Sequence, residues 1–416
     1  MEDEVCLDPD CDSSWLSRFP LSTQGRWVVD TNGDKFRLRG VNWYGASDIH
    51  GVVAGLNKQR LDVICESVRL LGFTVVRLPF SNEMLHADAP ANWSAIIDED
   101  LNPWATGLKP LQVYDEVVRG LARQNVAVVL NNHTTLGRWS GGPDRNGLWF
   151  EPSQQSSYTE QRWVEDWTFL ARRYAKCPHV VGYDLRNEVR PAPGRGALGV
   201  IRPLWPVWNQ DNAPADFCRA VLLASEALLS VASRLIIVER IVWPQDSLQK
   251  YTANPGPLLP KLSGQLVLAV HHYAWSGPGY FLPGAAPLED AGLPSWFCRL
   301  LDKTLGGGNY GSMSGDTLRR QLQEEWGSLL DDDVCPVWVS EFGAHSKKRY
   351  EMDWFRDFVA ALQEKDADWA YWPLYAENGE KPGGGAEGYG MLTADWRTKE
   401  DDDPRMTVLA AALLRG

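Results

Sequence analysis

The sequence predicts a (β/α)8 barrel, the TIM-barrel fold, with an amino-terminal β-hairpin and long loops after its strands. Eight short apolar runs are separated by segments in which apolar residues recur at helical spacing, without internal repeats. Several of these runs end in a charged or polar residue. The long irregular stretches all follow predicted strands, at 134–157, 189–215, 274–316 and 375–396. Loops in that position build the active face of a barrel, so the pattern predicts an enzyme with one enlarged cleft.

The chain opens with an acidic, aperiodic segment, residues 1–20, which we expect to be a loosely attached leader. We expect residues 21–416 to form one domain. Two short strand-like runs, 26–30 and 35–39, flank the pair Asn32-Gly33, and an Asn-Gly pair between such runs is the strongest local hairpin signal. We expect this hairpin to cover the amino-terminal end of the barrel.

Strands and helices then alternate to the end of the chain. Continuous apolar runs bounded by glycine or proline are typical of strands that are buried on both faces. The predicted strands are 40–45, 74–79, 126–133, 180–188, 235–239, 266–271, 337–343 and 369–374. Helical spacing is found at 58–71, 111–124, 158–174, 216–233 and 406–414, and the last of these would close the barrel.

Bulk composition excludes several classes of partner. The net charge of −13 and the pI near 5.1 argue against nucleic acid, which requires a basic surface. No apolar stretch approaches the length of a membrane span, and the seven cysteines show no CxxC spacing of a metal site. We expect a monomer without metal or cofactor. The first four residues lack the features of a signal peptide, so the protein is intracellular unless a leader was removed, in which case secretion is favoured.

Two predicted strands each deliver a glutamate at the carboxyl end. One is the run 337–343, which ends in Ser340-Glu341-Phe342-Gly343, and the other is 180–188, which ends in Asn187-Glu188. A single glutamate of this kind is more often a solvated surface residue. Two of them at the active face of one barrel instead indicate a pair of carboxylates in one cleft.

A larger set of strand-end residues resembles glycoside hydrolase family 5, the cellulase-like (β/α)8 enzymes, over about residues 27–396. The set is Arg77, His133, Asn187, Glu188, His271, Tyr273, Glu341 and Trp372. The motifs that carry the resemblance are Val-Val-Arg-Leu-Pro-Phe (75–80), Leu-Asn-Asn-His (130–133), Asp-Leu-Arg-Asn-Glu (184–188), His-His-Tyr (271–273), Ser-Glu-Phe-Gly (340–343) and Tyr-Trp-Pro-Leu (371–374). Arg-Gly-Val-Asn-Trp-Tyr-Gly (39–45) and Leu-Arg-Asn-Glu (185–188) look closest to eukaryotic cellulase-like members.

The resemblance implies that Glu188 is the acid/base and Glu341 the nucleophile of a retaining hydrolase. Such enzymes hold their two carboxyl groups about 5–5.5 Å apart. Repulsion between like charges across that gap is expected to raise the pKa of one carboxyl, so that one glutamate stays protonated near neutrality.

The resemblance also implies roles for the other matched residues. Arg77 would keep Glu341 ionised, and Tyr273 would donate a hydrogen bond to it. Asn187 would bind the sugar 2-hydroxyl, and Trp372 would provide a flat floor for the sugar at the cleavage site. His133 and His271 would orient these groups and the substrate hydroxyls.

Other residues near the strand ends remain open. Glu239 ends the fifth predicted strand but matches no family motif, and a salt bridge and a contact with a substrate hydroxyl are equally plausible. Val189 stands where the family usually has proline, which changes the exit of the fourth strand. Six loop tryptophans could be outer sugar platforms or loop packing: Trp139, Trp149, Trp205, Trp208, Trp243 and Trp275.

The predicted function is hydrolysis of a β-linked polysaccharide, oligosaccharide or glycoconjugate, with an endo-β-1,4-glucanase favoured. The same machinery would also suit a β-mannanase, a β-1,3-glucanase or a glycolipid-cleaving glycosidase. The alternative from another class is a carbohydrate-binding protein that has lost turnover. The presence of both Glu188 and Glu341 argues against it, because a protein that only binds carbohydrate has no need of both carboxylates.

Overall fold

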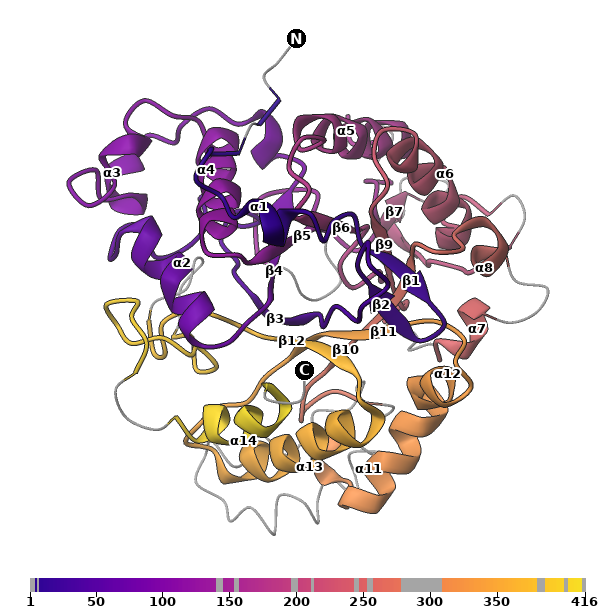
Figure 1. Ribbon diagram of the computed structural model, residues 1–416. Helices are drawn as coiled ribbons and strands as arrows, with labels where there is room; N and C mark the ends of the chain where they lie inside the picture. Colours follow the sequence, from indigo (N-terminus) through magenta and orange to yellow (C-terminus); the bar gives the residue numbers. More distant parts are fainter. Residues whose placement is uncertain are drawn as a thin grey trace.

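The computed structural model describes residues 4–5, 7–139, 145–152, 157–195, 201–210, 213–242, 247–252, 257–277, 309–379, 386–399 and 403–413 (Figure 1). Its centre is a closed barrel of eight parallel strands in the order β10-β11-β12-β3-β4-β5-β6-β9, which confirms the predicted fold class. The barrel strands are β3 (Arg39–Asn42), β4 (Val75–Ser81), β5 (Ala127–Thr134), β6 (Val180–Asp184), β9 (Leu235–Glu239), β10 (Leu266–His272), β11 (Val337–Phe342) and β12 (Asp368–Tyr371).

A helix follows each barrel strand, and Figure 1 shows these helices around the central strands. They are α2 (Leu61–Leu70), α4 (Pro110–Arg123), α5 (Glu160–Arg173), α6 (Phe217–Leu229), α8 (Leu258–Lys261), α11 (Gly315–Leu322), α13 (Arg349–Lys365) and α14 (Pro404–Leu413). Shorter turns are α1 (Ser13–Leu16), α3 (Trp93–Ile96), α7 (Gln249–Thr252), α12 (Ser328–Asp331), the 3-10 turns η1 (Met84–His86), η2 (Pro103–Ala105) and η4 (Tyr310–Ser312), and the π-helical turn η5 (Gln323–Gly327).

The core has two layers because side chains alternate between the two faces of each strand. One face packs outward against the helices in a large apolar cluster. The other fills the interior of the barrel, so that the barrel is packed rather than hollow. The interior residues include Val75, Ala127, Val129, Val181, Leu235, Ile237, Val267, Ala269, Trp338 and Ala370.

The amino-terminal hairpin covers the amino-terminal end of the barrel, as predicted. Phe19, Leu21, Val28 and Phe36 belong to the same apolar cluster as the barrel interior. The pairing differs from the prediction, because β1 (Ser22–Gln24) rather than the run 35–39 is the partner of β2 (Trp27–Val29). The chain still reverses at Asn32-Gly33, with a single bridge between Val29 and Lys35. The run 35–39 instead leads directly into the first barrel strand.

Residues before the hairpin are packed onto the barrel, which differs from the loose attachment that we expected. Val5 is 1% exposed, and its N–H donates to the carbonyl of Arg173 at the end of α5. Cys11 and Phe19 are also buried. The apolar residues of this segment are too few and too irregularly spaced to predict this packing from sequence.

The loops after the strands carry additional structure at the carboxyl end of the barrel. The loop after β6 contains an antiparallel pair, β7 (Ala192–Arg195) and β8 (Ile201–Leu204). Residues 278–308 of the predicted loop 274–316 lie outside the described residues. Among the helices of the described chain, none is both long and apolar enough to cross a bilayer.

Candidate active site

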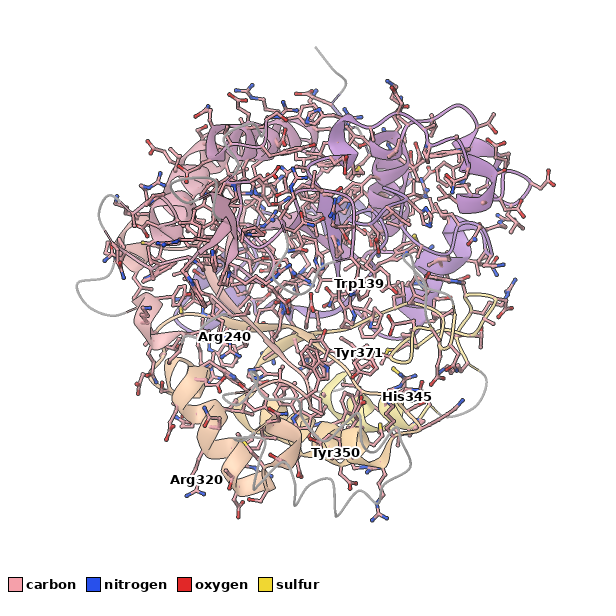
Figure 2. The ribbon with its side chains drawn as sticks, turned by 180° about the vertical axis from the view of Figure 1, so that it is seen from behind. Trp139, Arg240, Arg320, His345, Tyr350 and Tyr371 are labelled. Carbon is pink, nitrogen blue, oxygen red and sulfur yellow. The ribbon has the colours of Figure 1, made fainter. Side chains whose placement is uncertain are left out.

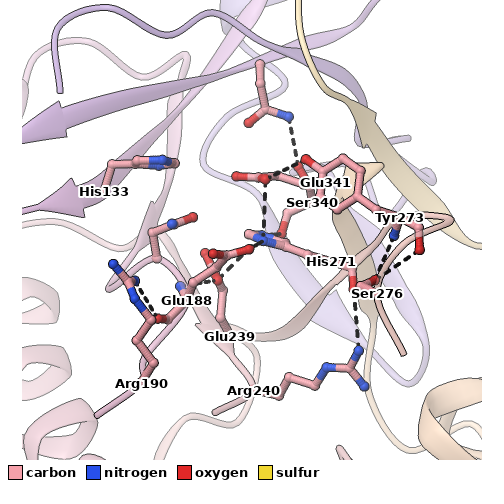
Figure 3. Close-up of polar contacts among 12 residues, drawn as sticks. His133, Glu188, Arg190, Glu239, Arg240, His271, Tyr273, Ser276, Ser340 and Glu341 are labelled. Carbon is pink, nitrogen blue, oxygen red and sulfur yellow. Dashed lines mark hydrogen bonds and ion pairs between the residues drawn. The ribbon is translucent and has the colours of Figure 1, made fainter. Parts of the chain in front are cut away.

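The structure brings all eight predicted site residues to the carboxyl ends of the barrel strands. Arg77, His133, His271 and Glu341 lie on β4, β5, β10 and β11, respectively. The other four stand in the turns just after a strand. They are Asn187 and Glu188 after β6, Tyr273 after β10, and Trp372 after β12. Figure 3 shows Glu188, His271, Tyr273 and Glu341 converging on one point, with His133 facing them.

The two glutamates are close to each other. One carboxylate oxygen of Glu188 lies within 4.8 Å of one of Glu341. Retaining glycosidases place their carboxyl groups about 5–5.5 Å apart, whereas inverting enzymes leave about 6.5–9.5 Å so that a water molecule fits between carboxylate and sugar. The spacing therefore suits direct attack by one of the carboxylates.

Both oxygens of Glu341 are held by donors. Arg77 Nη1 donates to Oε1 at 2.5 Å, and the Tyr273 hydroxyl donates to Oε2 at 2.8 Å. The side chain of Glu341 is 6% exposed, whereas that of Glu188 is 27% exposed. Glu341 is thus an immobilised carboxylate at the floor of the site, and Glu188 is the more accessible of the two.

Arg77 is completely buried and pairs with three carboxylates. Besides Glu341, it donates through Nε to Asp184 Oδ2 at 2.7 Å and through Nη2 to Glu239 Oε1 at 2.7 Å. One guanidinium cannot neutralise three buried carboxylates, so a second cation is needed nearby. Glu239 is therefore a salt-bridge partner of Arg77, which was one of the two interpretations left open by the sequence.

Two asparagines accept hydrogen bonds from Arg77. Arg77 donates to Asn42 Oδ1 at 2.9 Å and to Asn187 Oδ1 at 2.8 Å. Asn42 Nδ2 in turn donates to the carbonyls of Ser340 and Tyr371, at 2.9 and 3.1 Å. Because Arg77 fixes the oxygen of Asn187, the amide NH2 of Asn187 is the end left to donate to a sugar hydroxyl.

Glu188 stands in a strained turn. Its φ is +42°, in the left-handed region that non-glycine residues seldom adopt. Its N–H donates to Glu239 Oε2 at 2.8 Å, which holds the peptide in this conformation. Val189, in the position where the family usually has proline, is completely buried. The backbone of Glu188 is thus fixed by a buried carboxylate on one side and an apolar anchor on the other.

His271 is the second cation of the site. Its Nδ1 lies 3.1 Å from Glu188 Oε1 and 3.5 Å from Glu341 Oε2 (Figure 3). Its Nε2 lies 3.1 Å from Ser340 Oγ and 3.4 Å from Glu239 Oε2. Burial lowers the pKa of His271, but Glu239 and Glu341 outweigh burial and raise it to about 9. His271 is therefore an imidazolium at neutral pH.

The imidazolium reverses one expectation about Glu188. We expected repulsion between the two glutamates to raise the pKa of one of them. Burial does raise the pKa of Glu188, but the hydrogen bond and charge of His271 outweigh burial, and the pKa is lowered. The proton that an acid catalyst needs is thus held by His271, 3.1 Å from Glu188.

His133 and Trp372 form the opposite wall. Their rings are nearly parallel, with centroids 5.6 Å apart, and Tyr44 is parallel to Trp372 at 5.1 Å. Burial, with the charges of Arg77 and His271, lowers the pKa of His133 well below its usual value. Since Asn131 Oδ1 lies 2.8 Å from Nδ1, the neutral ring donates there and keeps Nε2 as an acceptor. That acceptor suits a sugar hydroxyl.

The candidate tryptophan platforms separate into two groups. Trp139, Trp205 and Trp275 are 39%, 47% and 37% exposed, so part of each residue is accessible to a ligand. Trp139, which is labelled in Figure 2, packs edge-on against Tyr44 and Trp372. Trp275 stacks on Tyr273 with ring centroids 5.1 Å apart. Trp149 and Trp208 are buried, and are loop packing. Trp243 lies outside the described residues.

Sequence reasoning missed Asn42, Asp184 and Ser340 as parts of the site. Each lies inside a quoted motif, but none looks unusual for its position. The signal that could have found them is position: Asn42 ends the first strand, Asp184 ends the fourth, and Ser340 precedes Glu341. Strand-end polar residues in a closed barrel all face one ring, so all three could have been included.

In the described part of the site, the carboxylates are already paired with protein cations. Arg77 and His271 are both in contact with the carboxylates, and a metal ion would have to displace one of these cations. That the protein works without metal or cofactor stays a prediction.

A closed (β/α)8 barrel with two glutamates at this spacing, one held by an arginine and a tyrosine, defines the class of glycoside hydrolases that use two carboxylates. Residues 29–378 match the family model "Cellulase (glycosyl hydrolase family 5)". The chain belongs to glycosyl hydrolase family 5 and is an enzyme.

Named relatives fit this assignment. The chain is 27% identical to an endoglucanase of Paenibacillus polymyxa over 387 residues, 90% of this chain and 83% of the relative. It is 32% identical over 272 residues to the major extracellular endoglucanase of Xanthomonas campestris. That alignment covers 62% of this chain and 49%, about half, of the relative.

Solved structures show the same fold. The catalytic domain of the Xanthomonas campestris endoglucanase aligns with a TM-score of 0.67 at 26% identity, over 94% of this chain and 99% of that one. An endocellulase from Pyrococcus horikoshii aligns with a TM-score of 0.71 at 22% identity, over 96% and 99% of the two chains. The second likeness concerns the fold alone.

Proposed function

We propose that the protein is a retaining endo-β-1,4-glucanase in which Glu341 is the nucleophile and Glu188 the acid/base. The observation that carries this proposal is the spacing of the two carboxylates, with oxygens within 4.8 Å of each other. The relatives that are named endoglucanases support the choice of substrate. The eight site residues lie on the strands and turns of one barrel, and we propose that a monomer is the active form.

In the first step, Glu341 attacks the anomeric carbon while Glu188 protonates the leaving oxygen. Arg77 and Tyr273 fix both oxygens of Glu341, so the attacking atom is in place before the substrate arrives. The bond to the leaving oxygen breaks as the ester to Glu341 forms. Asn187 donates to the sugar 2-hydroxyl, a bond that strengthens as positive charge develops on the ring.

In the second step, Glu188 acts as a base. It removes a proton from water, whose oxygen attacks the anomeric carbon and displaces Glu341. The greater exposure of Glu188 fits this role, because water and the leaving group must both reach it. The substrate lies over Trp372 and beside the acceptor nitrogen of His133.

A panel of polysaccharides tests the proposed substrate. We expect β-1,4-glucan to be cut faster than β-mannan, β-1,3-glucan or glycolipids, with mixed oligosaccharides as early products because an endo-acting enzyme cuts internal bonds. Product lengths are measured by chromatography over the first few per cent of hydrolysis. Glu341→Gln serves as the blank for contaminating activity. Faster cleavage of one of the other substrates would replace the proposed specificity, and release of a single short sugar from the start would contradict endo action.

The stereochemical course tests the mechanism. Two successive displacements restore the original configuration, so proton NMR should detect the β-anomer as the first product, before mutarotation. The measurement needs only the wild-type enzyme and a soluble oligosaccharide. An α-anomer at the earliest time points would rule out a glycosyl-enzyme on Glu341.

A further inference from the structure

Glu239 is a buried carboxylate that joins the three functional parts of the site. It ends β9 and is 1% exposed. Its Oε1 accepts from Arg77 Nη2 at 2.7 Å, and its Oε2 accepts from the Glu188 N–H at 2.8 Å. The same Oε2 lies 3.4 Å from His271 Nε2. A single side chain therefore contacts the cation of the nucleophile, the backbone of the acid/base and the imidazole between them.

We propose that Glu239 is a positioning residue that keeps a proton on His271 for delivery to Glu188, and that fixes the Glu188 peptide in its strained turn. This inference rests on the proposed roles of Glu188 and Glu341. Glu239 itself is screened from the substrate, because both of its oxygens are occupied by protein donors.

The proton route is short. His271 carries protons on both nitrogens, and its Nδ1–H faces Glu188 Oε1 at 3.1 Å. Transfer of that proton gives a neutral imidazole and a protonated Glu188, which then protonates the leaving oxygen as its bond to carbon breaks. In the second step Glu188 takes a proton from the attacking water and returns it to Nδ1. His271 loses one proton in the first step and regains one in the second, so the cycle balances.

The remaining proton of His271 identifies Glu239 as the group that stabilises the charge. Nε2–H donates to Ser340 Oγ at 3.1 Å, with Glu239 Oε2 beside it at 3.4 Å. Burial, with Asp184, raises the pKa of Glu239, and His271, Arg77 and the Glu188 N–H oppose this rise. Since both oxygens of Glu239 already accept hydrogen bonds, the proton shared by the pair resides on the imidazole.

Glu239 differs from the other carboxylates around His271 in keeping its charge throughout the reaction. Glu341 becomes an uncharged ester in the glycosyl-enzyme, and Glu188 is protonated and deprotonated in turn. Among the described residues, the charged or titratable groups that face His271 from each packed element are Arg77 (β4), His133 (β5), Glu188 (after β6), Glu239 and Arg240 (β9 and after), His272 and Tyr273 (β10 and after) and Glu341 (β11). Glu239 is thus the carboxylate in this set that is not itself proposed to react.

The test is the pH dependence of kcat/KM for Glu239→Gln, which removes the charge and keeps the shape. In the wild type the alkaline limb should report loss of the proton shared by His271 and Glu188. Without the charge of Glu239 that proton is lost more easily, so the limb should move to lower pH by about 1 unit or more. At pH values above both limbs, kcat/KM of the variant should then be about tenfold lower than that of the wild type. Ser340→Ala is the comparison variant: it removes a neutral partner of the same nitrogen, so it should move the limb less than Glu239→Gln does.

Two further measurements separate this role from simple structural support. A dinitrophenyl β-cellobioside needs no protonation to leave, so Glu239→Gln should form the glycosyl-enzyme from it at nearly the wild-type rate. In the wild type, the ¹⁵N shifts of His271, assigned by comparison with His271→Asn, should be those of an imidazolium at pH 7, which holds even if Glu239→Gln does not fold. A slower enzyme with an unmoved limb, or a neutral His271 at pH 7, would overturn the proposal. Neither result would touch the proposed function, which is tested separately by the substrate panel, by the stereochemical course and by the activities of Glu341→Ala and Glu188→Ala.

Discussion

Glu341→Ala is expected to lose at least about 10⁴-fold in kcat on every substrate, whatever its leaving group. Glu341 supplies the atom that attacks carbon, and no other described carboxylate can replace it, because Asp184 and Glu239 are tied to Arg77. Initial rates on soluble β-glucan and on dinitrophenyl β-cellobioside measure the loss. Glu226→Ala, an exposed glutamate on α6, is the matched control and should retain full activity.

Glu188→Ala should behave differently because Glu188 only moves protons. Loss of a general acid costs about 10²–10⁴-fold on an ordinary β-glucan. On the dinitrophenyl substrate the first step should survive, and the glycosyl-enzyme should accumulate because water lacks a base. Added azide needs no deprotonation, so it should restore turnover and give a β-glycosyl azide. With Glu341→Ala, azide should instead replace the missing nucleophile and give the α-product. Interchanged azide products would reverse the two assignments.

The sequence was sufficient to predict the parts of the molecule that barrel topology fixes. Parallel strands in a closed barrel end on one rim, so once eight strands are recognised, their terminal residues must share that rim. Arg77 and Glu341 are 264 residues apart in the chain and still meet at 2.5 Å. The order of the motifs along the chain was therefore enough to predict which residues meet in the site.

Side-chain pairing on the rim could not be predicted. Glu239 looked like any polar strand end, and only the structure shows that it accepts from both Arg77 and the Glu188 peptide. Repulsion was predicted to raise the pKa of one of the two glutamates, but that of Glu188 is lowered by His271, whose distance from the glutamates residue order does not specify. Electrostatic effects depend on ångström-scale separations and burial, which residue order does not specify.

The burial of single aromatic residues in loops could not be predicted from the sequence either. Trp149 and Trp275 both stand in loops after strands, yet one is 1% and the other 37% exposed. Likewise, Phe19 lies in an acidic, aperiodic segment and nevertheless closes the floor of the barrel. Periodicity predicts burial only within regular elements, so single residues in loops escape it.

The arrangement around Arg77 predicts a large stability effect as well as a catalytic one. Arg77→Met should lower the free energy of unfolding by roughly 3–5 kcal/mol at pH 7, because buried carboxylates lose their cation. Asp184, Glu239 and Glu341 would then repel one another in the folded state and bind protons there more readily than in the unfolded chain. Groups of this kind favour the folded state at low pH, so the destabilisation should be smaller at pH 5 than at pH 7. Urea denaturation of variant and wild type at both pH values measures the difference.

Arg173→Met is the matched control for this variant. Arg173 is also buried, and among the described residues it pairs with the carboxylate of Asp115, between α4 and α5 and away from the strand ends. Its loss should cost less stability and leave kcat nearly unchanged, whereas Arg77→Met should also lower kcat by about 10²-fold or more, because Glu341 loses the donor that aligns it. Equal stability losses in the two variants, or an Arg77→Met effect that grows as the pH falls, would contradict the proposed three-carboxylate network as the source of the effect.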